Sequence, residues 1–146
     1  GLPELGRVYD LLPLWIHPKE VHRLKPPARD PFVIHELAEG TKLPVGDWTF
    51  VHTPGHSAGG GCFYSAREGL LVTGDTLFIR DCGRTDLDTG NDTQMFESLQ
   101  RLKTFDPKTW ILPGHHYQIE TTRQLAQELT DNPPLQASSI EELARL

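Results

Sequence analysis

The spacing of apolar residues changes along the chain and predicts several short strands in its middle. From residue 32 onward, apolar side chains recur with a period of two over residues 32–37, 48–53, 62–65 and 70–73. Turn residues separate these runs, so we expect four strands there. Short apolar runs over residues 14–16 and 109–112 predict two further strands.

Helical spacing occurs at several other places. Met95, Leu99 and Leu102 follow a capping sequence at residues 91–94, which predicts a helix with these side chains in the core. Residues 5–12, 18–24 and 121–130 and a segment capped by Ser139 predict further helices, whereas residues 25–31 and 78–90 predict loops. Strands followed by helices indicate an α/β fold, and residues 1–146 are expected to form a single domain.

Composition narrows the possible functions. The chain has 146 residues and a formal charge of -6, which weighs against nucleic-acid partners and anionic membranes because both call for a basic patch. No run of 18 apolar residues and no signal peptide are visible, so we expect a cytoplasmic protein without membrane partners. The two cysteines are expected to be free thiols.

Three side chains that commonly bind metal ions each follow a glycine in a turn after an apolar run. His56 comes after Pro54-Gly55, Asp75 after Gly74, and His115 after Pro113-Gly114. Turns at the ends of neighbouring strands converge at one edge of a sheet, where α/β proteins build their sites. Two imidazoles and a carboxylate therefore predict a metal site.

The same segments resemble a known family. Residues 53–57 (Thr-Pro-Gly-His-Ser), 73–78 (Thr-Gly-Asp-Thr-Leu-Phe), 83–86 (Gly-Arg-Thr-Asp) and 113–115 (Pro-Gly-His) are similar to motifs of the metallo-β-lactamase superfamily. Its glyoxalase II-like hydrolases and their persulfide dioxygenase relatives are the most similar branch. The resemblance implies the αββα sandwich of that family.

Residues 1–52 do not match the family's opening motif, His-x-His-x-Asp-His, so the chain is expected to be the C-terminal part of such a fold. The missing N-terminal part would be its partner.

The resemblance also implies roles for individual residues. His56 would bind the first metal ion, His115 the second, and Asp75 both, which makes Asp75 the catalytic carboxylate. Arg84, His116 and Tyr117 would contact the substrate.

A second interpretation of Arg84 stays open. Arg84 and Asp86 could instead pair with each other and stiffen their loop. Asp86 also stands where glutathione hydrolases tend to have an aromatic residue, and the preceding residues 79–82 resemble hydrolases that act on carrier-protein thioesters.

Three functions remain in competition. The first is a hydrolase that uses two zinc ions to cleave a small-molecule or carrier-protein thioester. The second is a mononuclear iron dioxygenase that acts on a persulfide, since two histidines and a carboxylate also suit Fe(II). The third is a non-catalytic fragment or partner subunit. In every case, residues 1–146 alone are expected to be inactive, because they lack half of the metal ligands.

Overall fold

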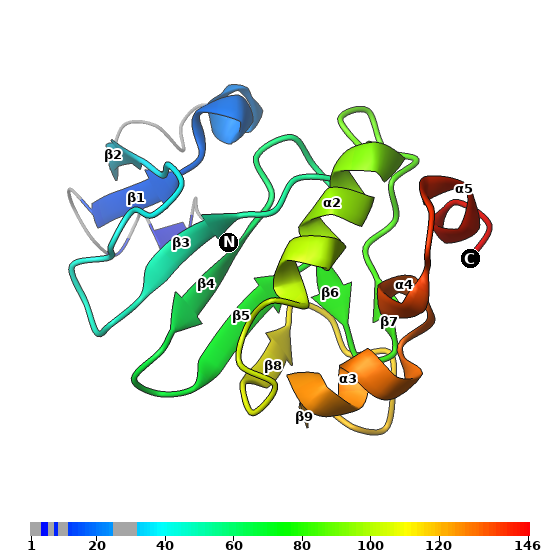
Figure 1. Ribbon diagram of the computed structural model, residues 1–146. Coiled ribbons are helices and arrows are strands. Elements are labelled where there is room, and N and C mark those ends of the chain that lie inside the picture. Colours follow the sequence, from blue (N-terminus) through cyan, green and yellow to red (C-terminus); the bar gives the residue numbers. More distant parts are fainter. Residues whose placement is uncertain (1–3, 6–7, 9–11, 25–31) are drawn as a thin grey trace. The chain divides into compact units, whose positions relative to one another are not determined.

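The computed structural model describes residues 4–5, 8, 12–24 and 32–146 (Figure 1). The predicted helix over residues 5–12 lies mostly outside the described residues, and so does the predicted loop over residues 25–31. The chain divides into two compact units, residues 1–38 and 39–146, and each is described by itself. The single domain predicted over the whole chain stays a prediction.

The first unit contains two parallel strands joined through a short helix. Strand β1 (Leu12–Ile16) pairs with β2 (Phe32–Glu36), and the helix η1 (Pro18–Arg23) follows β1. The predicted helix is present as a 3-10 helix of six residues, with Pro18 in its first turn and the His17 side chain as its N-cap. Most 3-10 helices have about three or four residues, so η1 is long for this geometry.

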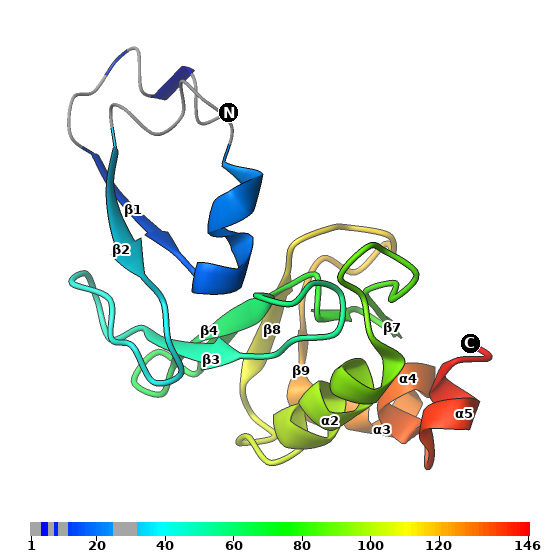
Figure 2. The same ribbon diagram turned by 90° about the horizontal axis from the view of Figure 1, so that it is seen from above.

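The second unit is built on a five-stranded sheet with the order β3-β4-β5-β8-β9 (Figures 1 and 2). Strands β5 and β8 are parallel, and the other neighbours are antiparallel. The strands predicted at residues 48–53, 62–65, 70–73 and 109–112 are confirmed. The bounds are β3 (Thr49–His52), β4 (Gly61–Ser65), β5 (Leu70–Gly74), β8 (Trp110–Pro113) and β9 (Arg123–Gln124), with a separate hairpin of β6 (Leu77–Phe78) and β7 (Asp81–Cys82).

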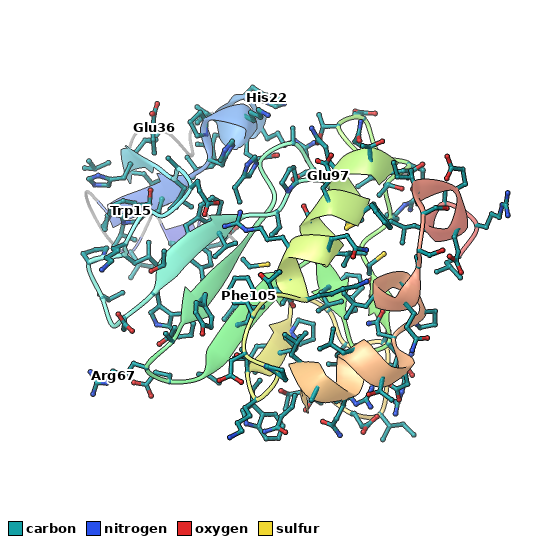
Figure 3. All side chains as sticks on the ribbon, in the orientation of Figure 1. Trp15, His22, Glu36, Arg67, Glu97 and Phe105 are labelled. Atoms are coloured by element: carbon teal, nitrogen blue, oxygen red, sulfur yellow. The ribbon has the colours of Figure 1, made fainter. Side chains whose placement is uncertain are left out.

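The helices α2 (Asp92–Leu102) and α3 (Leu125–Asp131) lie on the same face of this sheet (Figures 1 and 2), and α4 (Pro133–Gln136) and α5 (Ile140–Leu143) follow. The side chain of Asn91 caps α2 by accepting a hydrogen bond from the backbone N–H of Gln94 at 2.9 Å. Between the helices and the sheet lies a core that includes Met95, Leu99 and Leu102, each fully buried, as predicted. Phe105, labelled in Figure 3, follows α2 and meets Tyr64 edge-on at a centroid distance of 4.8 Å. None of the helices in the described residues is both long and apolar enough to cross a membrane.

Two predictions needed correction. Residues 121–130 were expected to form one helix, but residues 123–124 form β9, and the helix begins at Leu125. The sheet edge takes these residues because Trp110 pairs with Gln124, and Leu125 donates a backbone hydrogen bond to Thr109 at 2.8 Å. The loop predicted at residues 78–90 contains most of the β6–β7 hairpin. Strands of two residues are too short to show a period in the sequence.

A buried polar network joins this hairpin to the C-terminal helices. Glu128 and Asn132 are both fully buried. The Glu128 carboxylate accepts hydrogen bonds from the backbone N–H of Arg80 at 2.7 Å, from Arg123 at 2.8 Å and from Asn132 at 2.8 Å. The Asn132 amide also donates to two backbone carbonyls of residues 78–81. The hairpin that follows Asp75 is therefore held in place by the buried carboxylate of Glu128, which has hydrogen-bond partners on both oxygens.

Leu99 offers a test of the core. Leu99→Ala should lower the free energy of unfolding by about 2–5 kcal/mol, because it removes fully buried atoms and leaves a cavity. Urea unfolding measures this change. Glu97→Ala is the matched control, since Glu97 (labelled in Figure 3) is exposed on the same helix. Equal losses in both variants would contradict this description of the core.

Candidate metal centre

The turn that carries His56 is hydrogen-bonded to α2 and to its N-cap residue. The hydroxyl of Ser98 donates to the carbonyl of Pro54 at 2.6 Å, and the backbone N–H of Asn91 donates to the carbonyl of Gly55 at 2.8 Å. Gly55 has a φ of 140°, and a Cβ there would lie 2.4 Å from the Cα of Met95. Only glycine allows this contact, so helix packing sets the place of the His56 backbone.

The Asp75 turn is tied to the His56 turn by buried hydroxyl groups. The Oγ1 atoms of Thr53 and Thr76 lie 2.8 Å apart, and the Thr76 hydroxyl also lies 3.2 Å from the carbonyl of Thr53. Both threonines are buried. One threonine precedes His56 by three residues and the other directly follows Asp75, so the two candidate ligands are anchored to each other beneath the surface.

Two further glycines let other turns approach Asp75. A Cβ on Gly83 would lie 1.8 Å from the carbonyl oxygen of Asp75, and a Cβ on Gly114 would lie 2.9 Å from its Oδ1 atom. Side chains at positions 83 and 114 would therefore push their turns away. The absence of these side chains lets the Arg84 carbonyl approach His56 and lets His115 approach Asp75.

Asp75 lies between the two histidines and presents one carboxylate oxygen to each. Its Oδ2 atom is 3.6 Å from Nε2 of His56, and its Oδ1 atom is 2.6 Å from Nδ1 of His115. Nδ1 of His56 lies 2.9 Å from the backbone carbonyl of Arg84. A carbonyl can only accept, so Nδ1 of His56 carries a proton, and in the neutral ring the lone pair is then on Nε2, which faces Asp75.

These residues fit a divalent metal ion as a donor set, although among the described residues no three ligating side chains gather around one point. Ligands of one tetrahedral zinc ion lie about 3.4 Å apart, given bonds of about 2.1 Å. The 3.6 Å between His56 and Asp75 matches this spacing. The 2.6 Å contact between His115 and Asp75 is a direct hydrogen bond, which an ion shared by these two side chains would have to replace. His56 and Asp75 could share one ion, and Asp75 and His115 a second one.

The candidate ligands open into a cavity of about 260 Å³. Phe78 meets His115 and Tyr117 edge-on, and the rings of His115 and Tyr117 stack at a centroid distance of 5.8 Å. One wall of the cavity is therefore aromatic. The lining residues are His56, Asp75, Phe78, Asp81, Cys82, Arg84, His115 and Tyr117.

Neither cysteine is suited to act as a nucleophile. Burial, followed by the nearby carboxylates of Asp81 and Asp92, raises the pKa of the Cys82 thiol to about 12. Burial likewise raises the pKa of the Cys62 thiol to about 11. Thiolates, rather than thiols, are the reactive form, so both groups stay inert near neutral pH.

The residues predicted to contact substrate differ in their surroundings. Tyr117 and Arg84 line the cavity, and both are exposed. His116 is exposed too, but it is not among the described residues that line the cavity. Arg84 forms the alternative pair considered above, with its Nε 2.5 Å and its Nη2 2.6 Å from the two carboxylate oxygens of Asp86. The roles of all three residues in substrate binding stay predictions.

Several residues of this centre were not singled out from the sequence. Thr53 and Thr76 lie in the motifs themselves, directly after a strand and in a turn, and their hydroxyl groups gave no separate signal. Gly83 lies in the Gly-Arg-Thr-Asp motif, but its steric role was not predicted, because the contact that requires a glycine is made with the backbone of Asp75, which precedes the hairpin. Phe78 could have been noticed as the aromatic residue closest in sequence to Asp75.

Gly83→Ala tests the close approach of the turns. The added methyl group would meet the Asp75 carbonyl at 1.8 Å, so the turn must move, and the Arg84 carbonyl should lose its contact with His56. We expect zinc affinity to fall at least about tenfold, the typical loss when an outer partner of a ligand is removed. Titration calorimetry with zinc measures this change.

The control for this variant is Gly69→Ala. Gly69 has a φ of 64°, but nothing lies within 4 Å of the added Cβ. This control should therefore show only the backbone strain, about 1 kcal/mol in stability, with normal zinc affinity. Equal affinities for zinc in both variants would contradict the role assigned to Gly83.

Comparison with known proteins gives the chain its family. Residues 3–115 match the model of the metallo-β-lactamase superfamily. A hydroxyacylglutathione hydrolase of Cereibacter sphaeroides is 35% identical over 118 residues, which are 80% of this chain and 43% of that protein. The chain spans about half the length of the curated relatives it matches.

Solved structures agree with this assignment. ETHE1 from Myxococcus xanthus is 26% identical, with a TM-score of 0.70 over 99% of this chain and 72% of that one. The protein TTHA1623, solved in a di-iron-bound form, is 30% identical, with a TM-score of 0.74 over 90% of this chain and 69% of that one. The predicted α/β fold of the metallo-β-lactamase type is confirmed, and the chain belongs to the metallo-β-lactamase superfamily.

Proposed function

We propose that the protein containing this chain hydrolyses thioesters at a metal centre built around Asp75. The observation that carries the proposal is the position of the Asp75 carboxylate, which directs one oxygen toward His56 and the other toward His115. A carboxylate placed in this way can serve as a ligand shared by two ions. The hydroxyacylglutathione hydrolases among the relatives support a thioester as the substrate.

Each residue contributes a separate part of the chemistry. Divalent metal ions, when bound, supply hydroxide at neutral pH and polarise the carbonyl of the substrate. His56 offers Nε2, because the Arg84 carbonyl holds its other nitrogen. Phe78 and Tyr117 form an aromatic wall against which the substrate can pack. Water adds to the thioester carbonyl and the carbon–sulfur bond breaks, which yields a carboxylic acid and a thiol.

Iron-dependent oxidation of a persulfide is the second candidate. Two histidines and a carboxylate form a donor set that suits Fe(II), and one similar structure contains two iron ions. Metal analysis of the full-length protein separates the two candidates. About two equivalents of zinc favour the hydrolase. One equivalent of iron or less, without thioester hydrolysis, favours the oxygenase.

Asp75→Ala tests the shared ligand in the full-length protein. Loss of the carboxylate should abolish binding of at least one ion, and hydrolysis of S-lactoylglutathione should fall with it. Mass-spectrometric metal analysis after dialysis measures the first effect, and release of thiol measures the second. Asp88→Ala, which removes an exposed carboxylate from a nearby loop, is the control. Full metal occupancy in Asp75→Ala would remove Asp75 from the centre.

Residues 1–146 alone should not turn over thioesters. In the part of the chain that the structure describes, His56 and Asp75 would serve one ion, and Asp75 and His115 the other. Each ion would then have two protein ligands, whereas catalytic zinc sites have three. Purified residues 1–146 can be assayed directly for zinc affinity and hydrolysis. Turnover of about one per second or faster would show that these residues form a complete centre.

A further inference from the structure

The side chain of Arg84 is already engaged at the edge of the candidate metal centre. Its Nε and Nη2 atoms meet the two oxygens of Asp86 at 2.5 Å and 2.6 Å, which is the bidentate arrangement that guanidinium groups also form with carboxylates of ligands. This hydrogen bonding lowers the pKa of the Asp86 carboxyl group below its usual range, so Asp86 stays ionised at neutral pH. The Nε–Nη2 edge of the guanidinium group, one of the two edges that could bind a ligand carboxylate, is therefore occupied by a residue of the same loop.

The space around this pair is acidic. A second cavity, of about 320 Å³, shares Asp81, Cys82 and Arg84 with the cavity of the metal centre. Asp86 and Asp92 also line it, and Arg84 is the one cationic side chain among the described residues of its lining. Three carboxylates and one guanidinium group thus line this cavity, and the guanidinium group is paired with one of the carboxylates. A negatively charged ligand group would meet net repulsion, whereas an uncharged chain with amide groups would not.

We propose that Asp86 determines substrate choice by keeping Arg84 from binding anionic groups of the substrate. The proposal rests on the proposed thioester hydrolysis and adds the class of thiol carrier. Thioesters of uncharged carriers are preferred over those whose carriers have free carboxylates, such as glutathione.

The preference is graded rather than absolute. The side chains of Arg84 and Asp86 are 65% and 68% exposed. Exposed pairs of this kind are weak, so we expect the pair to change the affinity for a ligand carboxylate by about fivefold at most. A ligand carboxylate can therefore compete with Asp86 for the guanidinium group, but it does so at this disadvantage.

Asp86→Asn in the full-length, metal-loaded protein is the central test. Two thioesters with the same acyl group serve as probes: S-lactoylglutathione, which has carboxylates, and S-lactoyl-N-acetylcysteamine, which is uncharged. The ratio of kcat/KM for the glutathione probe to that for the uncharged probe should rise about fivefold in the variant, mainly through KM. The gain should shrink at high salt concentration, because the pair and its ligand contacts are exposed.

Asp88→Asn is the matched control. It removes the same charge from the same loop but leaves the pair of Arg84 and Asp86 in place, so the ratio should stay within about twofold of the wild type, the size of a screened surface-charge effect. Arg84→Ala, added to Asp86→Asn, should cancel the gain, since the freed guanidinium group is its cause. A general change in loop structure would alter both probes together and would survive the removal of Arg84.

Binding of S-methylglutathione, measured by calorimetry, keeps the inference separate from the proposed function. Asp86→Asn should bind this ligand about fivefold more tightly than the wild type. Tighter binding without hydrolysis of either probe would overturn the proposed function and leave the role of Asp86 intact. Unchanged binding, an unchanged ratio, or a gain that persists without Arg84 would overturn the role of Asp86.

Discussion

The candidate centre depends on one steric constraint, the close contact of three turns around Asp75. The backbone at Gly83 and Gly114 comes so near that Cβ atoms there would lie 1.8 Å and 2.9 Å from atoms of Asp75. Because no side chain intervenes, one turn brings a carbonyl to His56 and the other brings His115 to the carboxylate. The polar geometry of the centre is thus a consequence of backbone packing, and backbone packing is difficult to deform.

Buried polar groups that have hydrogen-bond partners of their own support this packing. Buried threonine hydroxyls connect the turns of His56 and Asp75, and Glu128 and Asn132 hold the hairpin after Asp75. A buried carboxylate is unfavourable unless it is paired, so the interactions of Glu128 with Arg123 and with the hairpin stabilise each other. The C-terminal helices therefore contribute to the centre although no residue of theirs lines its cavity within the described part of the chain.

The sequence predicts those parts of the molecule that repeat a period or combine a ligand with a turn. The strands at residues 48–53 and 62–65, the helix after Asn91 and the three candidate ligands all have such signals. Strand β9 had no such signal, because two residues cannot show a period. It also forms by pairing with Trp110, which lies elsewhere in the sequence. Pairing with Asp86 was one of two interpretations of Arg84, and the structure was needed to show that the pair forms. The carbonyl that orients His56 belongs to the backbone, which any residue type supplies equally.

The two groups of residue 84 that act on the site can change independently over evolutionary time. Residue 84 acts on His56 through its main-chain oxygen and on the adjoining cavities through its side chain. A substitution at residue 84 changes only one of these contributions, because it alters the side chain that lines the cavities and preserves the main-chain carbonyl. Descendants of one ancestor can therefore exchange residues 84 and 86 and acquire new substrates while the orientation of the ligand persists. Because residue 84 acts through two separate groups, substrate specificity can change while the reaction centre keeps its geometry.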